Sequence, residues 1–346
     1  MQRFIPNKQS IIEWLKAITV SFFVVLIIRT FCFEISPVSS PSMEKSLLTG
    51  DYMFINKLSY GPRLIRTLVS IPFINQKYYS DVISMPYLRL FGSPDVERND
   101  IVVFNYPIEE EYPVDHRTYF VKRCVAIPSD SLKIVDGLVY INHKLLDNEN
   151  NLQFNYHLKS AINLDSSFIT QYNLMEGGKI SDNNDYSFTL TKSLVDTFKT
   201  KSFLSEIKRN SEGKDVWDEF VFPFNSHYKW NVDNYGSLKI PAKGDVVLLD
   251  SLNICMYAKI ISDHEGNNLE IKNDSIFING QYKTSYTIQQ NYYFMMGDNR
   301  HNSQDSRHWG FVPEDHIIGK ATRIIFSNDK IYHQGIRWNR FFQGIQ

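Results

Sequence analysis

The sequence has almost no excess charge of either sign. Its 346 residues include 37 Lys and Arg against 38 Asp and Glu, which gives a formal net charge of -1. The basic residues are scattered along the chain rather than gathered into a stripe. Because nucleic-acid binding needs a concentrated positive surface that neutralises phosphates, we expect no nucleic-acid partner.

Cysteine is also scarce. Cys32, Cys124 and Cys255 are an odd number, and none of them belongs to a Cys-x-x-Cys pair or lies near histidines at metal-binding spacing. A disulfide framework or a zinc site would need such groupings. The sequence therefore predicts neither a disulfide framework nor a metal site.

Glycine and proline occur at ordinary levels, whereas aromatic residues make up 14% of the chain. Short stretches rich in Val, Ile, Tyr and Phe alternate with turn residues, a pattern typical of strands. A mainly β fold follows. The clearest predicted strand stretches are residues 100–106, 119–127, 132–141 and 275–278.

One apolar run interrupts this pattern near the N-terminus. Residues 11–33 are overwhelmingly apolar, and Ala17 to Ile28 carry no charge. About 23 residues at roughly 1.5 Å each would span roughly 34 Å, enough for the hydrocarbon core of a bilayer. Arg3, Lys8 and Lys16 precede or open the run, so the positive-inside tendency predicts a single transmembrane helix with a cytoplasmic N-terminus.

A cleavable secretory signal is the alternative, because the uncharged run alone is short enough for one. The best cut would follow Val38-Ser39-Ser40, which places Pro41 directly after it. A proline ring with no N–H fits badly in an extended substrate. We therefore favour a retained anchor.

The segment from about 147 to 237 differs from its surroundings. It is rich in Asn, Ser, Lys and Asp, and its apolar residues show helical spacing around 191–207. We interpret it as part of a large inserted subdomain of α+β or β type. A change in composition and in periodicity together is typical of a separate folding unit.

A weak internal repeat presents two candidate lysines. Residues 132–142 resemble residues 269–279, and both stretches predict a hairpin. At the same offset Lys122 aligns with Lys259, each after an aromatic-containing strand stretch. Duplication and coincidence both explain the similarity, since alternation and short turns are common.

Ser42 and Lys122 could together carry chemistry. A serine hydroxyl becomes a useful nucleophile when a neighbouring base removes its proton, and a lysine can be that base only when its amine is neutral. Lys122 lies in a largely apolar strand stretch, and burial there would lower its pKa. The simpler interpretations are a solvated serine-rich linker and a lysine packed along a sheet with its amine in water.

Three motifs follow one another along the chain. They are Ser40-x-Ser42-Met43 beside the apolar run, Lys122-Arg123-x-x-Ala-x-Pro-x-Asp130, and the late run from Gly297-Asp298-Asn299-Arg300 through Ser303 to Arg307. In this order they resemble the motifs of the bacterial type I signal peptidases, of peptidase family S26. Further similar stretches lie at 50–63 and 98–104. Departures from the family pattern are Lys45-Ser46, Ser129 and His301.

The resemblance implies a role for each motif. Ser42 would be the nucleophile and Lys122 its general base, chosen over Lys259 because Lys122-Arg123 matches the family motif. Ser40 would place its hydroxyl beside the Ser42 N–H to form an oxyanion hole, and Ser303 would orient the lysine amine. Structural support of the site would come from the loop residues Asp298, Asp305 and Arg307.

It also implies a β-rich catalytic domain shared with self-cleaving repressors. The expected function is removal of N-terminal signal peptides from exported preproteins with small residues before the cut, by an acyl-enzyme route with no cofactor and no metal. The enzyme would be a single-pass, monomeric protein of the bacterial inner membrane, with its N-terminus cytoplasmic, its catalytic domain periplasmic, and contact with the lipid bilayer. The alternatives are a self-cleaving Ser-Lys peptidase and a catalytically silent membrane-anchored binding protein.

The expected organisation has six parts. They are a cytoplasmic N-terminus at 1–10, a transmembrane helix at 11–33, a first part of the catalytic core at 34–146, an inserted subdomain with the repeat-like hairpin at 147–283, a second core part at 284–330, and a tail at 331–346.

Overall fold

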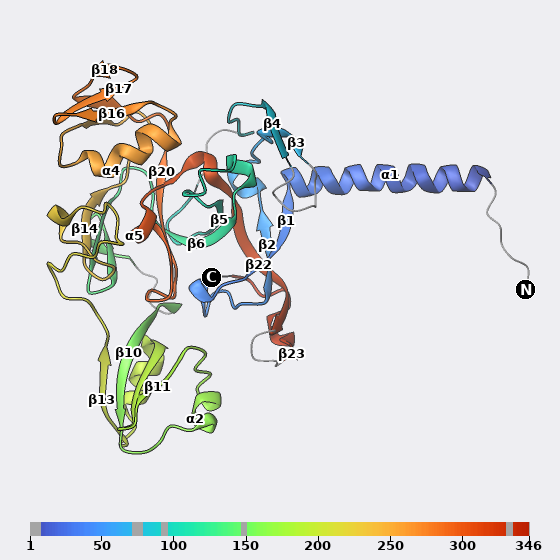
Figure 1. Cartoon of the computed structure of the whole chain (residues 1–346). Helices are drawn as coiled ribbons and strands as arrows, with labels where there is room; N and C mark the ends of the chain where they lie inside the picture. Colours follow the sequence, from blue (N-terminus) through green and yellow to red (C-terminus); the bar gives the residue numbers. More distant parts are fainter. Residues whose placement is uncertain (1–7, 71–78, 91–95, 147–150, 330–334, 346) are drawn as a thin grey trace, which may run out of the picture.

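A computed structural model of the chain describes residues 8–70, 79–90, 96–146, 151–329 and 335–345. The parts of the predicted N-terminus at 1–7, of the insertion at 147–150 and of the tail at 331–334 lie outside the described residues. Within the described residues the fold is mainly β with one long N-terminal helix, as predicted (Figure 1).

The long helix α1 spans Lys8–Phe31 and projects from the rest of the molecule (Figure 1). Its segment Gln9–Phe31 has 23 residues, a mean hydropathy of 2.2 and no part buried within the protein. An apolar helix of this length that no other element covers is suited to a bilayer. The predicted spanning helix is therefore present, with its end two residues earlier than expected.

The main sheet curls around the centre of the molecule and is antiparallel throughout (Figure 1). Two predicted strand stretches, 100–106 and 119–127, become its adjacent strands β5 and β6. The strand order is β1 (Phe33–Pro37), β2 (Asp51–Asn56), β22 (Ile317–Asp329), β5 (Ile101–Asn105), β6 (Tyr119–Ala126), β20 (Tyr292–Met296) and β21 (Val312–Pro313), and β23 (Gly335–Ile336) pairs with β22.

Strand β5 is buried on both faces, which explains its unbroken apolar sequence. Ile101 and Val103 pack into one hydrophobic cluster with Met43. Val102 and Phe104, which alternate with them, pack into a second cluster around Trp309. This two-sided packing fixes the register of β5 against its neighbour β6, because a one-residue slip would exchange the two faces.

The two predicted hairpins are both confirmed. Residues 132–142 form β7 (Ser131–Val135) and β8 (Leu138–Ile141), and residues 269–279 form β16 (Leu269–Lys272) and β17 (Ser275–Ile278). Each turns through two residues with positive φ, Asp136-Gly137 and Asn273-Asp274. Such two-residue turns match the twist of antiparallel strands.

These hairpins belong to different small sheets. β7 and β8 lie in the order β14 (Tyr235–Lys239), β7, β8, β9 (Lys144–Leu145), whereas β16 and β17 pair with β18 (Gln281–Tyr282). The remaining pairs are β15 (Val246–Leu248) with β19 (Ser285–Thr287) and β3 (Thr67–Ser70) with β4 (Tyr79–Ser84); a short helix α4 (Ile254–Lys259) lies between β15 and β16 in the sequence.

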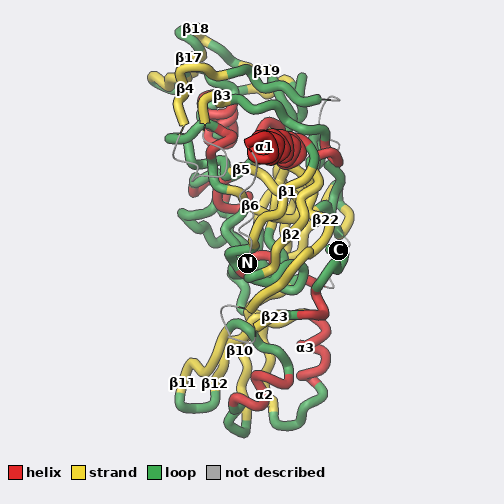
Figure 2. Tube along the Cα trace, turned by 90° about the vertical axis from the view of Figure 1, so that its right-hand side faces the viewer, coloured by secondary structure: helices red, strands yellow, loops and turns green. Residues whose placement is uncertain are grey.

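Residues 153–209 form a lobe of their own at the end of the molecule opposite β16 to β18 (Figures 1 and 2). Its sheet has the order β11 (Gly177–Ser181), β12 (Asp185–Thr191), β10 (Gln153–Ser160), β13 (Leu204–Arg209). Helices α2 (Ser166–Gln171) and α3 (Lys192–Lys199) cover its apolar cluster, which includes Leu158 and Phe198. We call residues 153–209 the inserted lobe.

The helical spacing around 191–207 predicts a helix, which is wrong for the second half of that segment. Helix α3 ends at Lys199, and residues 204–209 are strand β13, paired with β10. Leu204 and Ile207 contact the cluster of the inserted lobe from this strand. Tertiary pairing with β10 therefore overrides the local periodicity.

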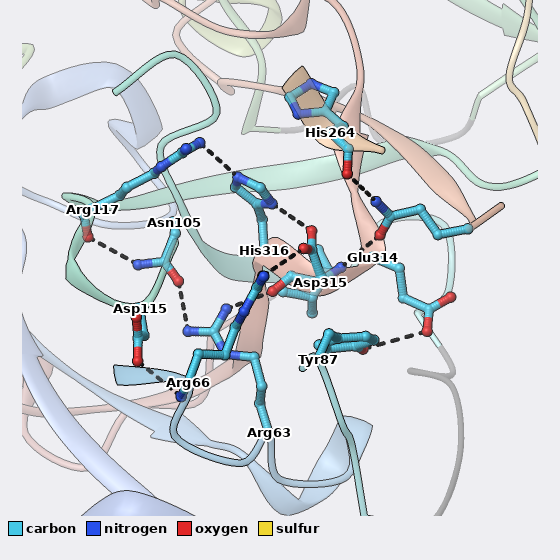
Figure 3. A network of polar contacts seen from close by, with 12 residues as sticks. Arg63, Arg66, Tyr87, Asn105, Asp115, Arg117, His264, Glu314, Asp315 and His316 are labelled. Carbon is cyan, nitrogen blue, oxygen red and sulfur yellow. Dashed lines mark hydrogen bonds and ion pairs between the residues drawn. The ribbon is translucent and has the colours of Figure 1, made fainter. Parts of the chain in front are cut away.

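A polar network ties the β3–β4 hairpin to the main sheet (Figure 3). Arg63 donates to the Asp315 carbonyl at 2.6 Å, and Arg66 donates to the Asp315 carboxylate at 2.9 Å. The backbone N–H of Arg66 and of Thr67 donate to Asp115. The network thus fixes the base of a hairpin that lies near the end of α1 (Figure 1).

The C-terminal residues 335–345 pack back on the main sheet. Arg340 donates to the buried carboxylate of Asp51 on β2, with contacts of 3.0 and 2.6 Å. Ile345 packs against the cluster that contains Met43. This part of the predicted tail therefore braces the strand that follows the Ser42 segment.

Candidate active site

Strand β6 places Lys122 in the interior. Lys122 pairs with Val102 on β5, and its side chain is only 3% exposed. Its amine lies 5.3 Å from the centre of the Phe120 ring. Burial lowers the pKa of Lys122 from 10.5 to about 8, although the negative charges of Asp305 and Asp298 oppose the fall. A substantial fraction of the amine is therefore neutral near pH 8.

Ser42 reaches the same place from a short turn after β1. Pro41, Ser42 and Met43 form one turn of 3-10 helix, and proline at its first position presets the required backbone angle. The Ser42 side chain is buried, and the Lys122 amine donates to its Oγ at 2.6 Å. The structure therefore brings together two predicted residues that are 80 positions apart.

Ser40 also lies beside the nucleophile candidate. Its Oγ is 3.2 Å from Ser42 Oγ, and either hydroxyl can donate. Ser40 precedes the 3-10 turn with an extended backbone, so its side chain projects alongside the turn. The predicted Ser40, Ser42 and Lys122 side chains thus form one connected group.

Ser303 lies close to Gly297. We call residues 297–307 the late loop. A Cβ built on Gly297 would lie 2.3 Å from Ser303 Oγ and 2.5 Å from the Ser42 carbonyl. The absence of a side chain at Gly297 therefore lets Ser303 and the Ser42 backbone approach each other. In the described structure the Ser303 hydroxyl donates to the Gln304 carbonyl at 3.4 Å, whereas the Lys122 amine donates to Ser42 and to the Val121 carbonyl.

Buried ion pairs hold the late loop. Arg307 donates to both carboxylate oxygens of Asp305, at 2.9 and 2.8 Å. Burial raises the pKa of Asp305, but the Arg307 charge and its hydrogen bonds outweigh burial and bring that pKa to about 2. The Gly297 N–H also donates to Asp305. Asp305 and Arg307 therefore brace the loop as charged partners.

Asp298 connects the loop to two other elements. Arg123, next to Lys122 on β6, donates to both of its carboxylate oxygens, at 2.8 and 2.7 Å. Ser46, four residues after Ser42, donates to Asp298 at 2.6 Å. A single buried carboxylate thus links the serine segment, the lysine strand and the late loop.

The sequence motifs do not predict that Arg123 and Ser46 belong to this site. Arg123 is part of the lysine motif, and Ser46 departs from the family pattern. Strand alternation predicts that Arg123 faces away from Lys122, so only its contact with Asp298 in the folded protein reveals its part in the site. Nothing local to Ser46 indicates its contact with Asp298, which is 252 residues away in the chain.

Lys259 lies in a different setting from Lys122. It is in the last turn of α4 rather than after a strand, so the strand context expected for it is wrong. Its side chain is 38% exposed and forms an ion pair with Glu110 at 3.3 Å. Lys259 therefore pairs with Glu110, whereas Lys122 contacts Ser42.

A cavity of about 720 Å³ opens beside Ser303. Its lining comes from the late loop, through Arg300 and His301, and from the inserted lobe, through Lys208 and Arg209. Both signs of charge line it, because Glu206, Glu212 and Asp233 also contribute. Among the described residues, no three His, Cys, Asp or Glu side chains come together in a group that could hold a metal ion.

Comparison with known proteins gives the family. Residues 11–190 and 281–326, more than half of the chain, match the family described as signal peptidase, peptidase S26. The chain belongs to this family. It is a peptidase of the kind that the sequence motifs indicated, and the two matched segments contain all the predicted site residues.

Relatives align over nearly the whole chain. The Signal peptidase I of Buchnera aphidicola subsp. Schizaphis graminum (strain Sg) is 30% identical over 97% of this chain and 82% of its own length. That of Haemophilus influenzae is 25% identical over 96% of this chain and 76% of its own length. The match to a solved signal peptidase I from Enterococcus faecalis V583 covers 67% of this chain and 100% of that one, at 17% identity and a TM-score of 0.25.

Proposed function

We propose that this chain is a membrane-anchored signal peptidase that removes N-terminal signal peptides from exported preproteins with a Ser42/Lys122 dyad. Family membership and relatives named Signal peptidase I support the reaction. The observation that carries the dyad is the buried contact of 2.6 Å between the Lys122 amine and Ser42 Oγ. No histidine takes part in this contact.

In the proposed first step, Ser42 Oγ attacks the carbonyl carbon before the cut while the neutral Lys122 amine takes the hydroxyl proton. The tetrahedral intermediate then collapses. The peptide C–N bond breaks, and Lys122 gives its proton to the leaving amine of the mature protein. The signal peptide stays attached to Ser42 as an ester.

Water completes the reaction. Lys122, neutral again, takes a proton from a water molecule that attacks the ester carbonyl. The bond to Ser42 breaks, and the proton returns to Ser42 Oγ as the signal peptide leaves with a free carboxylate. The burial of Lys122 suits this double use, because a pKa of about 8 allows the amine both to accept and to release a proton near neutral pH.

We assign the negative oxygen of the intermediate to the Ser40 hydroxyl and the Ser42 N–H. The Ser40 hydroxyl lies 3.2 Å from Ser42 Oγ and so can rotate toward an oxygen bound there. Ser303 is proposed to orient the Lys122 amine once a substrate excludes water. Asp298, Asp305 and Arg307 would act by fixing the late loop.

We propose that α1 is a retained anchor in the inner membrane, with the N-terminus cytoplasmic and the catalytic part periplasmic. Lys57 on the loop after β2 supports retention, because it donates to the Arg29 carbonyl of α1 at 2.9 Å and forms a 2.8 Å ion pair with Glu34. The anchor would hold the site where the substrate's own apolar helix ends, and a monomer would suffice for the reaction.

The deciding experiment compares preprotein cleavage by the full-length wild type, Ser42→Ala, Lys122→Met and Lys259→Met in detergent micelles. The substrate carries alanine at the first and third positions before the cut. Ser42→Ala and Lys122→Met should lose roughly 1,000-fold or more of kcat/KM, because each removes a reacting group. In the wild type, kcat/KM should rise with pH around a midpoint of about 8 as Lys122 loses its proton.

Lys259→Met is the matched control, since it removes an exposed lysine that forms an ion pair. It should stay within about twofold of the wild type. Retained cleavage by Ser42→Ala, or loss confined to Lys259→Met, would contradict the assigned dyad. Circular dichroism of each variant checks that the fold is intact.

A further inference from the structure

The inserted lobe is joined to the late loop by backbone hydrogen bonds. The Gln153 N–H donates to the Asp298 carbonyl at 2.9 Å, and the Arg300 N–H donates to the Gln153 carbonyl at 2.9 Å. The first residue of β10 therefore pairs through its backbone with two residues of the late loop. The inserted lobe is thus in direct contact with the late loop.

Glu176, just before β11, adds a side-chain connection to the same loop. Its Oε2 accepts from the side-chain amide of Asn299 and its Oε1 accepts from that of Asn302, each at 2.8 Å. One carboxylate thus holds two points of the loop that are three residues apart. Two hydrogen bonds to the two oxygens of one carboxylate restrict the loop more than a single bond would.

Asn299 passes this restraint to the nucleophile. Asn299 is fully buried, its backbone N–H donates to the Ser42 carbonyl at 3.1 Å, and its side-chain amide also donates to the Pro41 carbonyl at 3.3 Å. Asn302 is next to Ser303 in the sequence. The Glu176 carboxylate therefore connects both to the turn that carries Ser42 and to the segment that carries Ser303.

We propose that Glu176 is a positioning residue for the peptidase reaction, which sets the late loop and the Ser42 turn in their reactive arrangement from the inserted lobe. The inference rests on the proposed function, since it assigns a role in that same reaction. A displacement of about 1 Å in a reacting group can cost roughly 100-fold in rate, so a restraint of this kind acts on turnover.

The position of Glu176 indicates that its side chain is not needed for the stability of the inserted lobe. Glu176 is half-buried and is not a member of the hydrophobic cluster that holds the lobe together. The lobe also keeps its backbone bonds to Asp298 and Arg300 without the Glu176 side chain. Loss of the carboxylate should therefore loosen the loop without unfolding the lobe.

The test uses full-length Glu176→Ala, Glu176→Gln and the control Asp196→Ala with the same preprotein. Asp196 is 61% exposed on α3 of the same lobe. Glu176→Ala should lower kcat by roughly 10- to 100-fold while KM changes by less than about twofold. Glu176→Gln keeps one carbonyl oxygen as an acceptor, so its kcat should lie between those of the alanine variant and the wild type.

Turnover is expressed per reactive site, counted with a reagent that acylates serine. A purely structural role would reduce the number of reactive sites and leave the turnover of each unchanged. Asn302→Ala completes a double-mutant cycle, and the double variant should be no slower than Glu176→Ala, because both changes remove the same bond.

An unchanged kcat per site in Glu176→Ala, or additive effects in the cycle, would overturn the inference. These outcomes differ from failure of the proposed function, which Ser42→Ala tests by itself. If Ser42→Ala is inactive and Glu176→Ala turns over normally, only the role of Glu176 is wrong. If Glu176→Ala does not fold, the turnover of Glu176→Gln and Asn302→Ala decides the question.

Discussion

At the scale of single residues, burial decides which groups near Ser42 carry charge. Lys122 is buried without an adjacent counter-ion, and its pKa falls to about 8. Asp305 is equally buried but is paired with Arg307, and its pKa falls to about 2. The same desolvation therefore neutralises an unpaired amine and leaves a paired carboxylate ionised.

Glu44, two residues after Ser42, is a third buried ionisable group. It is 3% exposed, and its Oε1 has no hydrogen-bond partner. Burial raises the pKa of Glu44 from 4.5 to about 7, with a further increase from the Glu176 charge, against a decrease from Lys45. The folded protein therefore holds a proton on Glu44 at pH values where the unfolded chain has lost it.

Glu44→Gln should remove this dependence on pH. Stability from the protonated Glu44 is fully present below pH 4.5 and is lost as the pH rises through about 7, a change of roughly 3 kcal/mol. The variant keeps a neutral side chain at all pH values. Relative to the wild type, its free energy of unfolding should therefore rise by about that amount between pH 4 and pH 8.

Urea unfolding of the two proteins in detergent micelles at both pH values measures the effect. Glu219→Gln is the matched control, because it replaces an exposed carboxylate instead of a buried one. A pH-independent difference between Glu44→Gln and the wild type would show that folding does not raise the pKa of Glu44.

At the scale of elements, the site is made where three chain segments meet. The 3-10 turn supplies Ser42, β6 supplies Lys122 and Arg123, and the late loop supplies Asp298 and Ser303. A Cβ on Gly297 would meet both Ser303 of the late loop and the Ser42 carbonyl of the turn. The loop can pack this closely only because residue 297 has no side chain.

Gly297→Ala should therefore impair the enzyme strongly. The added Cβ would lie 2.5 Å from the Ser42 carbonyl, a backbone atom that cannot turn away. Overpacking of this kind costs about 1–3 kcal/mol and displaces the Ser42 turn, so kcat/KM should fall roughly 100-fold. Preprotein cleavage measures the loss.

Gly344→Ala provides the comparison, since a Cβ there meets nothing within 4 Å and the backbone needs no positive φ. The Gly344→Ala variant should cleave the preprotein at the rate of the wild type. Equal activities of the two alanine variants would mean that the late loop can shift without consequence for the site.

At the scale of the whole molecule, α1 and the inserted lobe lie at different ends of the catalytic core (Figures 1 and 2). The anchored end includes α1 and the nearby β3–β4 hairpin, and the lobe lies beyond the late loop. With the proposed orientation, the entire region after residue 33 faces the periplasm.

This orientation predicts the outcome of protease protection. Protease added to intact spheroplasts should degrade the catalytic part while a cytoplasmic marker protein stays intact. Replacement of the N-terminal charges by Arg3→Glu, Lys8→Glu and Lys16→Glu should lower the degraded fraction, because the positive-inside preference is removed. If the catalytic part of the wild type were fully protected from the protease, the proposed topology would be wrong.

Much of the fold follows from patterns that are short in sequence. The apolar run of α1, the strands β5 and β6 and the two hairpins were predicted because a strand or helix reveals itself within about ten to twenty residues. The transition from α3 to β13 was missed because the pairing with β10 determines it. The predicted boundaries of the inserted subdomain, residues 147 and 283, stay a prediction.

Local sequence patterns suffice to predict the long apolar helix, the β-rich character and the ordered motifs that contain Ser42, Lys122 and Ser303. The contact of the buried Lys122 with Ser42, and the exposure of Lys259 on a helix, follow only from how distant segments pack. The tertiary structure alone links Arg123 to Asp298, 175 residues apart, and Glu176 to the late loop. Such contacts depend on strand register and packing between distant segments, which no local pattern encodes.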